Sequence, residues 1–163
     1  MKIIIFDTDI LSMFAKAGAL DVLFNLLSGF KLCITPKIKE EFSAPLKYGY
    51  SFPQQIFDKF ELVLPTKEEY LESEHFQTLY PFLGKGEIEA IPMAKIRKCV
   101  FATNDLKAFN VALKEGITVI NVHIILRTLL RKKIFNKSDL KKLIQKLEAS
   151  DNTKIKHTDI IFE

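Results

Sequence analysis

Short apolar runs alternate with longer amphipathic stretches along most of the chain. Runs of strand length occupy residues 2–6, 31–35, 60–65, 99–103 and 117–122. Between them hydrophobic residues recur at helical spacing, as Ile10, Leu11 and Phe14 do after the first run. Strands that alternate with helices favour parallel pairing, because each helix returns the chain to the starting edge of the sheet. The pattern therefore predicts an α/β fold, a three-layer α/β/α arrangement with a mainly parallel, Rossmann-like sheet.

Capping and breaking residues mark the ends of the expected helices. Thr66 and Glu69 have the spacing of a capping box, which predicts a helix from Thr66 to about Tyr80. Pro92 predicts a kink in the helix expected at 87–98. The segment 44–53, APLKYGYSFP, combines prolines, a glycine and tyrosines without a period, so it is interpreted as a loop or mobile arm.

Length and composition favour one domain. A chain of 163 residues with 48% hydrophobic residues hides roughly two-thirds of its unfolded surface on folding. We expect residues 1–149 to form the domain and residues 150–163 to form a polar, loosely held tail. No apolar run approaches the ~20 residues that cross a bilayer, and the first six residues lack the features of a secretory signal. Cys33 and Cys99 lie in apolar stretches as small hydrophobes, which indicates a reducing cytoplasm.

Four acidic side chains are the candidates for chemistry. Asp7 ends the first strand and Asp105 ends the fourth, while Glu41 and Glu87 lie on helices that follow or precede strands. Functional groups in a parallel sheet gather beyond the carboxyl ends of the strands. Clustered carboxylates repel one another unless a cation joins them, and Mg²⁺ or Mn²⁺ prefers such oxygen ligands. Phosphodiester hydrolysis uses a metal ion of this kind.

Each acid also has a purely structural interpretation. Asp9 fits a helix N-cap better than a ligand, and Asp105 can cap its own helix. Glu87 in a first helical turn is favoured by the helix dipole alone. Asp7 is the hardest to explain structurally, because a charge at the end of a buried strand is costly without a partner.

Basic residues suggest a polyanionic partner. The net charge is +4 and the isoelectric point about 9.0, which favours binding to phosphates. Lys37, Lys85 and Lys107 each lie within a few residues of a proposed ligand, so they are the candidate contacts to the phosphate backbone of such a partner. The lysines of KKIFNKSDLKK also fit the solvated face of a helix.

Four segments, in order, resemble the motifs of PIN domains, including VapC-like toxins. IIIFDTDILSMFAKAG is similar to their opening motif, and ITPKIKEEF to the helix that carries their second acid. LGKGEIEAI resembles their Gly-Glu-x-Glu-Ala motif, and VFATNDLKAFNVALKEGITVINV the segment with their fourth acid. The Gly-Thr that many relatives place after the last strand is absent.

The resemblance implies a metal site and places its ligands. Asp7, Glu41, Glu87 and Asp105 would bind Mg²⁺ or Mn²⁺, with Glu40 an alternative to Glu41. By the same resemblance Thr8 and Thr103 would place hydroxyls close to the site, and Asp9 would lie at the helix entry. Glu89 and Asn104 are further supporting candidates because they lie near the proposed ligands in sequence. The implied activity is endonucleolytic hydrolysis of single-stranded RNA, often as the toxin of a toxin–antitoxin pair.

Two other functions remain open at this point. The stretch IIIFDTDIL also resembles the nucleophile motif of HAD phosphatases, in which Asp7 would be phosphorylated. A PIN fold can also bind RNA or protein without cutting. The aromatic segment KYGYSFP offers a surface for an antitoxin protein or a homo-oligomer.

Overall fold

A five-stranded parallel sheet forms the centre of the molecule. The computed structural model describes residues 1–163 and places the strands in the order β3-β2-β1-β4-β5. They span Lys2–Phe6 (β1), Phe30–Ile34 (β2), Glu61–Leu62 (β3), Val100–Ala102 (β4) and Val119–Ile120 (β5). All four pairings are parallel. The predicted α/β fold with a parallel sheet is therefore confirmed.

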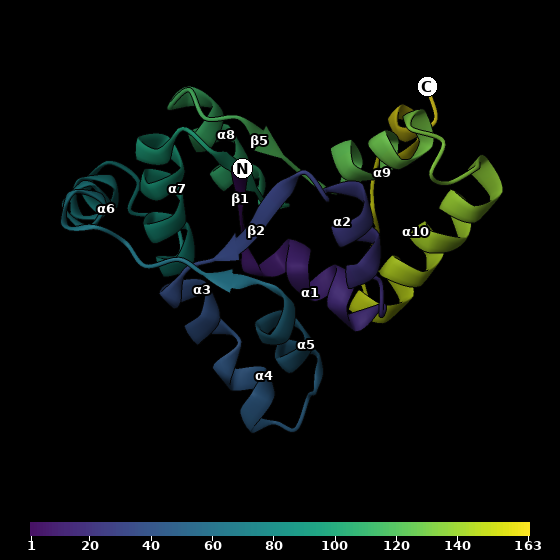
Figure 1. The fold of residues 1–163 in the computed structure, drawn as a ribbon, viewed down its shortest axis with the longest axis horizontal. Coiled ribbons are helices and arrows are strands. Elements are labelled where there is room, and N and C mark those ends of the chain that lie inside the picture. The colour runs from purple at the N-terminus through teal and green to yellow at the C-terminus, as the bar shows by residue number, and fades with distance from the viewer.

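Helices cover both sides of this sheet. The helices preceding the last two strands are α6 (Lys67–Leu79), α7 (Lys85–Arg97) and α8 (Leu106–Lys114). The others are α1 (Thr8–Lys16), α2 (Leu20–Leu26), α3 (Pro36–Glu41), α4 (Ser43–Lys47), α5 (Phe52–Lys59), α9 (Val122–Arg131), α10 (Lys137–Asp151) and a final 3₁₀ turn η1 (Thr158–Ile161). Helix α1 packs on α2 and α5, whereas α7 packs on β1 and β4 with α6 outside it. Figure 1 shows these two groups on opposite sides of the sheet.

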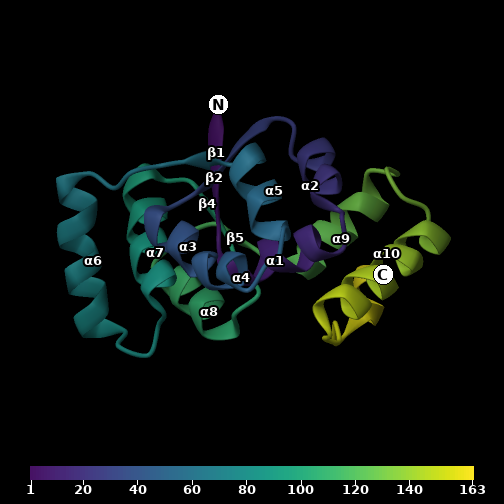
Figure 2. The same cartoon turned by 90° about the horizontal axis from the view of Figure 1, so that it is seen from below.

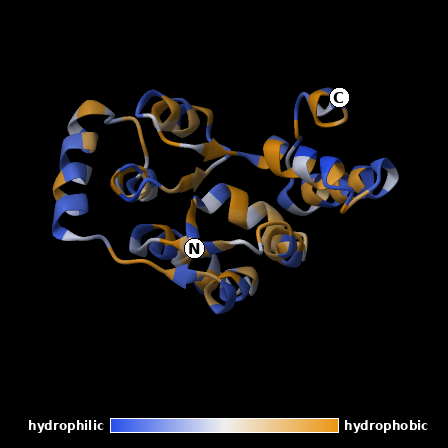
Figure 3. Ribbon diagram, turned by 45° about the horizontal axis from the view of Figure 1, so that its top comes forward, coloured by the Kyte–Doolittle hydropathy of each residue, from blue (hydrophilic) through white to orange (hydrophobic).

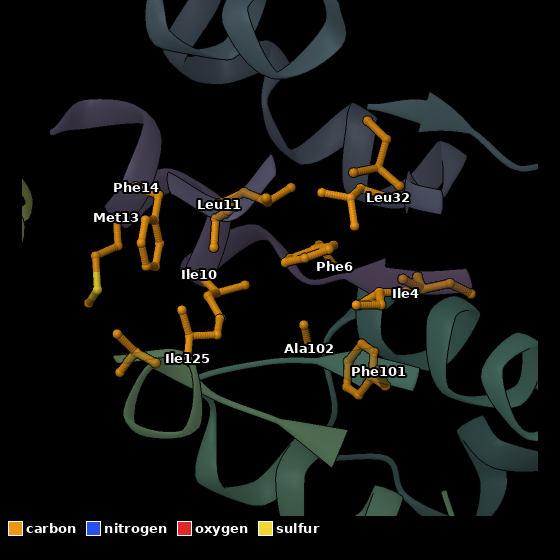
Figure 4. Packing of buried hydrophobic residues seen from close by; sticks show 14 of the residues in the cluster. Ile4, Phe6, Ile10, Leu11, Met13, Phe14, Leu32, Phe101, Ala102 and Ile125 are labelled. Carbon is orange, nitrogen blue, oxygen red and sulfur yellow. The ribbon is translucent and has the colours of Figure 1, made fainter. Parts of the chain in front are cut away.

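The core lies between the sheet and its covering helices. Phe6 on β1, Phe101 on β4 and Phe14 on α1 are all completely buried (Figure 4). Figure 3 shows hydrophobic colour along the central strands, while the outer helix α6 is largely hydrophilic. Figure 2 shows α6 and α10 at opposite ends of the molecule. No helix is both long and apolar enough to cross a membrane.

The interpretation of residues 44–53 as a loop is wrong in part. Residues 43–47 form α4, and α5 begins at Phe52. Pro53 lies in the first turn of α5, where the backbone N–H that proline lacks would have no partner within the helix. Proline therefore starts a helix here. Pro92, where the sequence predicts a kink, lies inside α7, and the helix runs from Lys85 to Arg97.

The sequence predicts a loosely held tail at residues 150–163, whereas in the structure this segment packs against the domain. Ile155 and Ile161 are buried, and η1 packs against α9. The backbone N–H of Ile155 donates to the Glu148 carboxylate at 2.9 Å. His123 Nε2 lies 2.6 Å from the carbonyl of Lys156. The two buried isoleucines thus anchor this segment to the domain.

Candidate active site

Asp7 lies where β1 ends and α1 begins. Only 4% of its surface is exposed. One carboxylate oxygen accepts the backbone N–H of Thr8 at 2.8 Å, so Asp7 is the N-cap of α1. The other accepts the hydroxyl of Thr103 at 2.9 Å. These two hydrogen bonds hold the Asp7 side chain in one orientation, although no Lys, Arg or His side chain forms an ion pair with it.

Asp105 reaches the same edge of the sheet from the neighbouring strand. Strand β4 pairs with β1, with Phe6 opposite Ala102. Thr103 follows at once, and its hydroxyl accepts the backbone N–H of Asp105 at 3.1 Å. Asp105 in turn caps α8 by accepting the N–H of Ala108 at 2.8 Å. One threonine hydroxyl therefore links the two aspartates.

Glu41 comes from α3 and is held between two other elements. Its Oε1 accepts the backbone N–H of Gly86 at 3.1 Å, and its Oε2 accepts the hydroxyl of Thr8. A Cβ on Gly86 would lie 2.6 Å from Glu41 Oε1 and 3.1 Å from Ile38 Cγ1. Only glycine at position 86 permits this close approach of α7 to α3. The adjacent Glu40 instead pairs with Lys37 at 3.2 Å.

Glu87 stands in the first turn of α7. Its Oε2 accepts the backbone N–H of Gly84 at 2.9 Å, which satisfies a donor at the start of the helix. This contact leaves the carboxylate at the same opening as the other acids. Glu87 therefore combines a capping role with a place at the candidate site.

These groups line one pocket of about 310 Å³. Its walls come from α1, α3, α7, α8 and the residues just before α1, α7 and α8. The lining residues are Asp7, Thr8, Asp9, Glu41, Phe82, Gly84, Glu87, Asp105 and Lys107. We call it the acidic pocket. It contains five carboxylates and one lysine, so its electrostatic potential favours cations.

Burial and mutual repulsion raise the pKa values of three carboxylates of the pocket. Burial, with a contribution from Glu87, raises the pKa of Asp7 from 3.8 to about 7, against the lowering effect of its two hydrogen bonds. Burial also raises the pKa of Glu87, and Asp105, Asp9 and Glu41 add to this effect. The pKa of Asp9 is raised by burial and by Asp105 and Glu41. A nearby cation would reverse each of these shifts.

Asp9 departs from the capping role that the sequence favoured. The cap of α1 is Asp7, and Asp9 lies in the first turn of the helix and lines the acidic pocket. The expectation failed because strand β1 runs directly into α1. The residue at the end of the strand is then also the residue before the helix.

Other candidates from the sequence lie outside the acidic pocket. The Glu89 carboxylate accepts the backbone N–H of Lys37 at 2.8 Å. Lys37, Lys85 and Glu89 line a separate pocket of about 320 Å³ between α3, α6 and α7. The amide oxygen of Asn104 accepts the N–H of Val122 at 3.0 Å and so ties α9 to the end of β4. Of the three proposed lysines, only Lys107 lines the acidic pocket.

One pocket residue was not expected from the sequence. Phe82 lies in the segment between α6 and α7, is 55% exposed and is the only hydrophobic residue of the acidic pocket. Its position two residues before Gly84, at the start of the helix that carries Glu87, was the one sequence feature that could have placed it near the acids. Burial could not be judged there, because the segment LYPFLG has no helical or strand period.

The donor set fits a hard divalent cation. All candidate ligands are carboxylate or hydroxyl oxygens, the ligands that Mg²⁺ and Mn²⁺ prefer. No three His, Cys, Asp or Glu side chains are arranged as a ready metal cage. Mg²⁺ sites in enzymes commonly use one or two carboxylates and keep several waters. The orientation of Asp7 by two hydrogen bonds before any ion arrives suits such a site.

The protein is an α/β protein whose acidic side chains gather beyond the carboxyl ends of two neighbouring parallel strands, β1 and β4. The chain matches the family model DUF3368, described as a PIN domain, over residues 3–158. The protein therefore belongs to the PIN domain family. No curated protein matches the chain.

Two solved structures of low sequence identity share the fold. A chain of VapBC2 from Rickettsia felis, bound to a DNA fragment from its promoter, has a TM-score of 0.57 at 14% identity, and the match covers 73% of this chain and 98% of that one. A chain of VapBC-1 from nontypeable Haemophilus influenzae gives 0.57 at 12% identity, covering 72% and 96%. At these identities the similarity is one of fold.

Proposed function

We propose that the protein is a metal-dependent endoribonuclease that hydrolyses phosphodiester bonds of single-stranded RNA at the acidic pocket. The observation that carries the proposal is the meeting of Asp7, Glu41, Glu87 and Asp105, from four separate elements, in one pocket. Membership of the PIN domain family supports it. Mg²⁺ or Mn²⁺ would activate the attacking water and neutralise charge developing on the phosphate.

The chain's own residues prepare the site. Asp7, whose pKa is raised to about 7, would hold the cation, and the cation would keep it ionised at neutral pH. The hydroxyls of Thr8 and Thr103 fix Glu41 and Asp7 through the hydrogen bonds described above. Asp105 and Glu87 are oriented by the helix starts that they cap. Preorganised ligands of this kind avoid reorganisation during the reaction.

Lysines near the pocket would bind the RNA backbone. Lys107 lies inside the acidic pocket, while Lys37 and Lys85 line the neighbouring pocket beside α7. Phosphate contacts add affinity and salt dependence without reading sequence. A strand held by all three lysines would pass across the start of α7.

The phosphatase interpretation has little support. The family model that matches residues 3–158 is that of a PIN domain and not of a phosphatase. The non-catalytic alternative remains as an outcome of the test below. In it, the pocket would bind RNA and release it uncut.

We further propose that the protein acts with an antitoxin protein as one half of a toxin–antitoxin pair. The support is the fold shared with chains of two VapBC structures. The exposed Tyr48 and Tyr50 offer a surface for that partner or for a second copy of the chain. The free thiols of Cys33 and Cys99 agree with a reducing, cytoplasmic setting.

A matched pair on α3 tests the proposal. We expect Glu41→Gln to lower the rate of RNA cleavage by on the order of a hundredfold or more, because a site ligand loses its charge. Glu40→Gln, one residue away and outside the pocket, should cleave like the parent. Both proteins are assayed on a labelled single-stranded RNA with Mg²⁺, with Mn²⁺ and with a chelator. Equal activity of the two variants, or cleavage that survives the chelator, would refute the proposal.

A further inference from the structure

The acidic pocket contains one feature that its acids do not explain. Phe82 keeps 55% of its surface exposed beside five carboxylates. Single exposed apolar residues are common on protein surfaces and need no explanation on their own. This ring differs because it lies in the wall of the pocket where the backbone of a nucleic acid would be cut. A nucleic-acid strand that enters the pocket would therefore pass beside it.

The ring is held in place by its neighbours. It packs against the ring of Tyr80 with 6.1 Å between centroids and an interplanar angle of 80°. The Tyr80 hydroxyl donates to Glu115, which also binds Lys95 at 2.9 Å. An edge-on contact of this kind leaves a face of the Phe82 ring free for another planar group. The aromatic side chain is thus both oriented and accessible.

A lysine lies beside the same ring. The Lys107 ammonium is 6.0 Å from the centroid of Phe82 and lines the same pocket. At this distance the attraction of the cation to the ring is weak. The flexible stem of lysine allows the ammonium to leave the ring for a phosphate group. Ring and ammonium together can therefore receive a base and its attached phosphate.

Charge explains why an apolar contact is useful here. A nucleic-acid strand carries a phosphate at every nucleotide, and the five carboxylates of the pocket repel them. Stacking of a base on an aromatic ring is not opposed by that repulsion, since the base is neutral. Every base has a flat face, so the contact does not depend on sequence. A base paired within a duplex has no such face available.

We infer that Phe82 is a stacking platform for one unpaired base of the substrate, and that Lys107 binds a phosphate next to that base. The inference rests on the proposed function and specifies how single strands are selected. Phe82 is a specificity-determining residue, because it binds the strand and does not take part in hydrolysis. Loss of the ring weakens binding of single strands, while the metal site is unchanged.

Because the protein contains no tryptophan, fluorescence provides a direct test. Phe82→Trp is made in Asp7→Asn protein, so that RNA is not cut while Mg²⁺ is present. A single-stranded oligoribonucleotide should quench the indole emission, because a base stacks on it. The same strand paired in a duplex, or an abasic strand with equal phosphates, should leave the emission unchanged. Tyr48→Trp in the same background is the control, since Tyr48 is 82% exposed and lies outside the acidic pocket.

Binding constants give the second arm. Phe82→Leu retains an apolar side chain without a ring, and should weaken binding of the single strand roughly five- to a hundredfold, whereas Phe82→Tyr should bind like the parent. Lys107→Gln should weaken binding and lower the slope of affinity against salt by about one unit. Thermal unfolding of each variant should match the parent, because both side chains are exposed.

The outcomes separate this inference from the proposed function. If Phe82→Leu binds and cleaves single strands like the parent, or duplex quenches Phe82→Trp as strongly as single strand, the stacking role is excluded and the nuclease proposal stands. If single strands quench as expected but the parent never cleaves RNA, the stacking role stands and the nuclease proposal fails. Failure of single-stranded RNA to quench Phe82→Trp also excludes stacking.

Discussion

Asp7 in the acidic pocket and Glu69 at the start of α6 are both nearly hidden from water, with 4% and 1% of their surface exposed. Arg97 binds Glu69 through two nitrogens, at 2.6 and 2.9 Å. Burial alone would raise the pKa of Glu69, but the hydrogen bonds from Arg97 and from the Thr66 backbone bring it below its ordinary value. Asp7 has no ion-pair partner. Its pKa is raised to about 7.

The difference separates a buried charge that stabilises the fold, Glu69, from one that we propose to bind a metal ion, Asp7. Glu69 completes the capping box with Thr66, and through Arg97 it joins α6 to α7. Asp7 is surrounded by other carboxylates, so its ionised form costs the fold free energy unless a cation arrives. Perturbed carboxylates without a structural partner cluster at functional sites. The four predictions below test this contrast, in order of decreasing effect.

The largest effect is expected on cleavage by Asp7→Asn. Loss of the charge should lower the rate of metal-dependent cleavage roughly a thousandfold or more. This factor corresponds to about 4 kcal/mol of lost transition-state stabilisation. Asparagine remains a good N-cap and removes one repelling charge, so the metal-free variant should be at least as stable as the parent. Mg²⁺ should raise the melting temperature of the parent more than that of the variant.

Scanning calorimetry with and without Mg²⁺, beside the cleavage assay, measures these effects. Asp139→Asn is the control, since that residue lies on α10 far from the pocket in sequence. A variant that melts earlier than the parent, responds equally to Mg²⁺ and still cleaves RNA would make Asp7 a structural residue like Glu69.

The second prediction concerns pH in the absence of metal. Between pH 3.8 and about 7, native Asp7 keeps a proton that the unfolded chain releases. Stability therefore falls as pH rises through this window, by up to about 4 kcal/mol at about 1.4 kcal/mol per unit. Glu87 and Asp9, whose pKa values are also raised, act in the same direction. Glu69 has a lowered pKa, so its contribution is present above its ordinary pKa of 4.5 and is lost as pH falls through the folded value.

Urea unfolding of the parent and Asp7→Asn at pH 5 and pH 8 checks this sign. With a chelator present, the variant should lose less stability than the parent between the two values. Equal losses would mean that Asp7 titrates alike in the folded and unfolded chains.

The third prediction removes the cation from the paired carboxylate. Arg97→Met leaves Glu69 buried without its partner and should cost about 3 kcal/mol of stability, the low end for a broken buried pair because Arg97 itself reaches solvent. The double variant Glu69→Gln with Arg97→Met should recover part of the loss. Chemical unfolding of the three proteins measures both steps, and cleavage at low temperature should stay at the parent level. A stable Arg97→Met protein would show that the ion pair contributes little.

The smallest change is Gly86→Ala. The new Cβ would displace the Glu41 carboxylate, which can move, and press on Ile38, which is buried. We expect cleavage to fall roughly ten- to a hundredfold through misplacement of Glu41. Stability should change by less than about 1 kcal/mol, because alanine favours the helix that the clash disturbs. Gly29→Ala is the control, since a Cβ there meets nothing within 4 Å. Full activity of Gly86→Ala would show that cleavage does not require glycine at position 86.

The sequence predicted the parts of the fold that local signals determine. The parallel sheet followed from alternating apolar runs, and the capping box at Thr66 and Glu69 is present in the structure. The interpretation of residues 44–53 as a loop failed for a physical reason. Proline in a first helical turn looks identical, in sequence, to proline in a loop, as Pro53 shows.

For the pocket, the sequence could name acids but not their directions. The family resemblance favoured Glu41 and left Glu40 as an alternative. In the structure Glu41 accepts the N–H of Gly86, whereas Glu40 pairs with Lys37. Glu89 and Asn104 were candidates by proximity in sequence, yet each bonds to a backbone N–H elsewhere. Phe82 depends on how the chain between two helices turns. Such information belongs to tertiary packing and not to any local pattern.

The pairing of β1 with β4 also fixes an order of events during synthesis. Residues 4–6 align with residues 100–102. Nearly a hundred further residues must therefore be made before Asp7 can lie beside Asp105. A nascent chain that has only its amino-terminal half outside the ribosome holds β1 without this neighbour. The pocket is therefore incomplete throughout most of translation. A nascent chain of this length therefore lacks the assembled site at which we propose that RNA is cut.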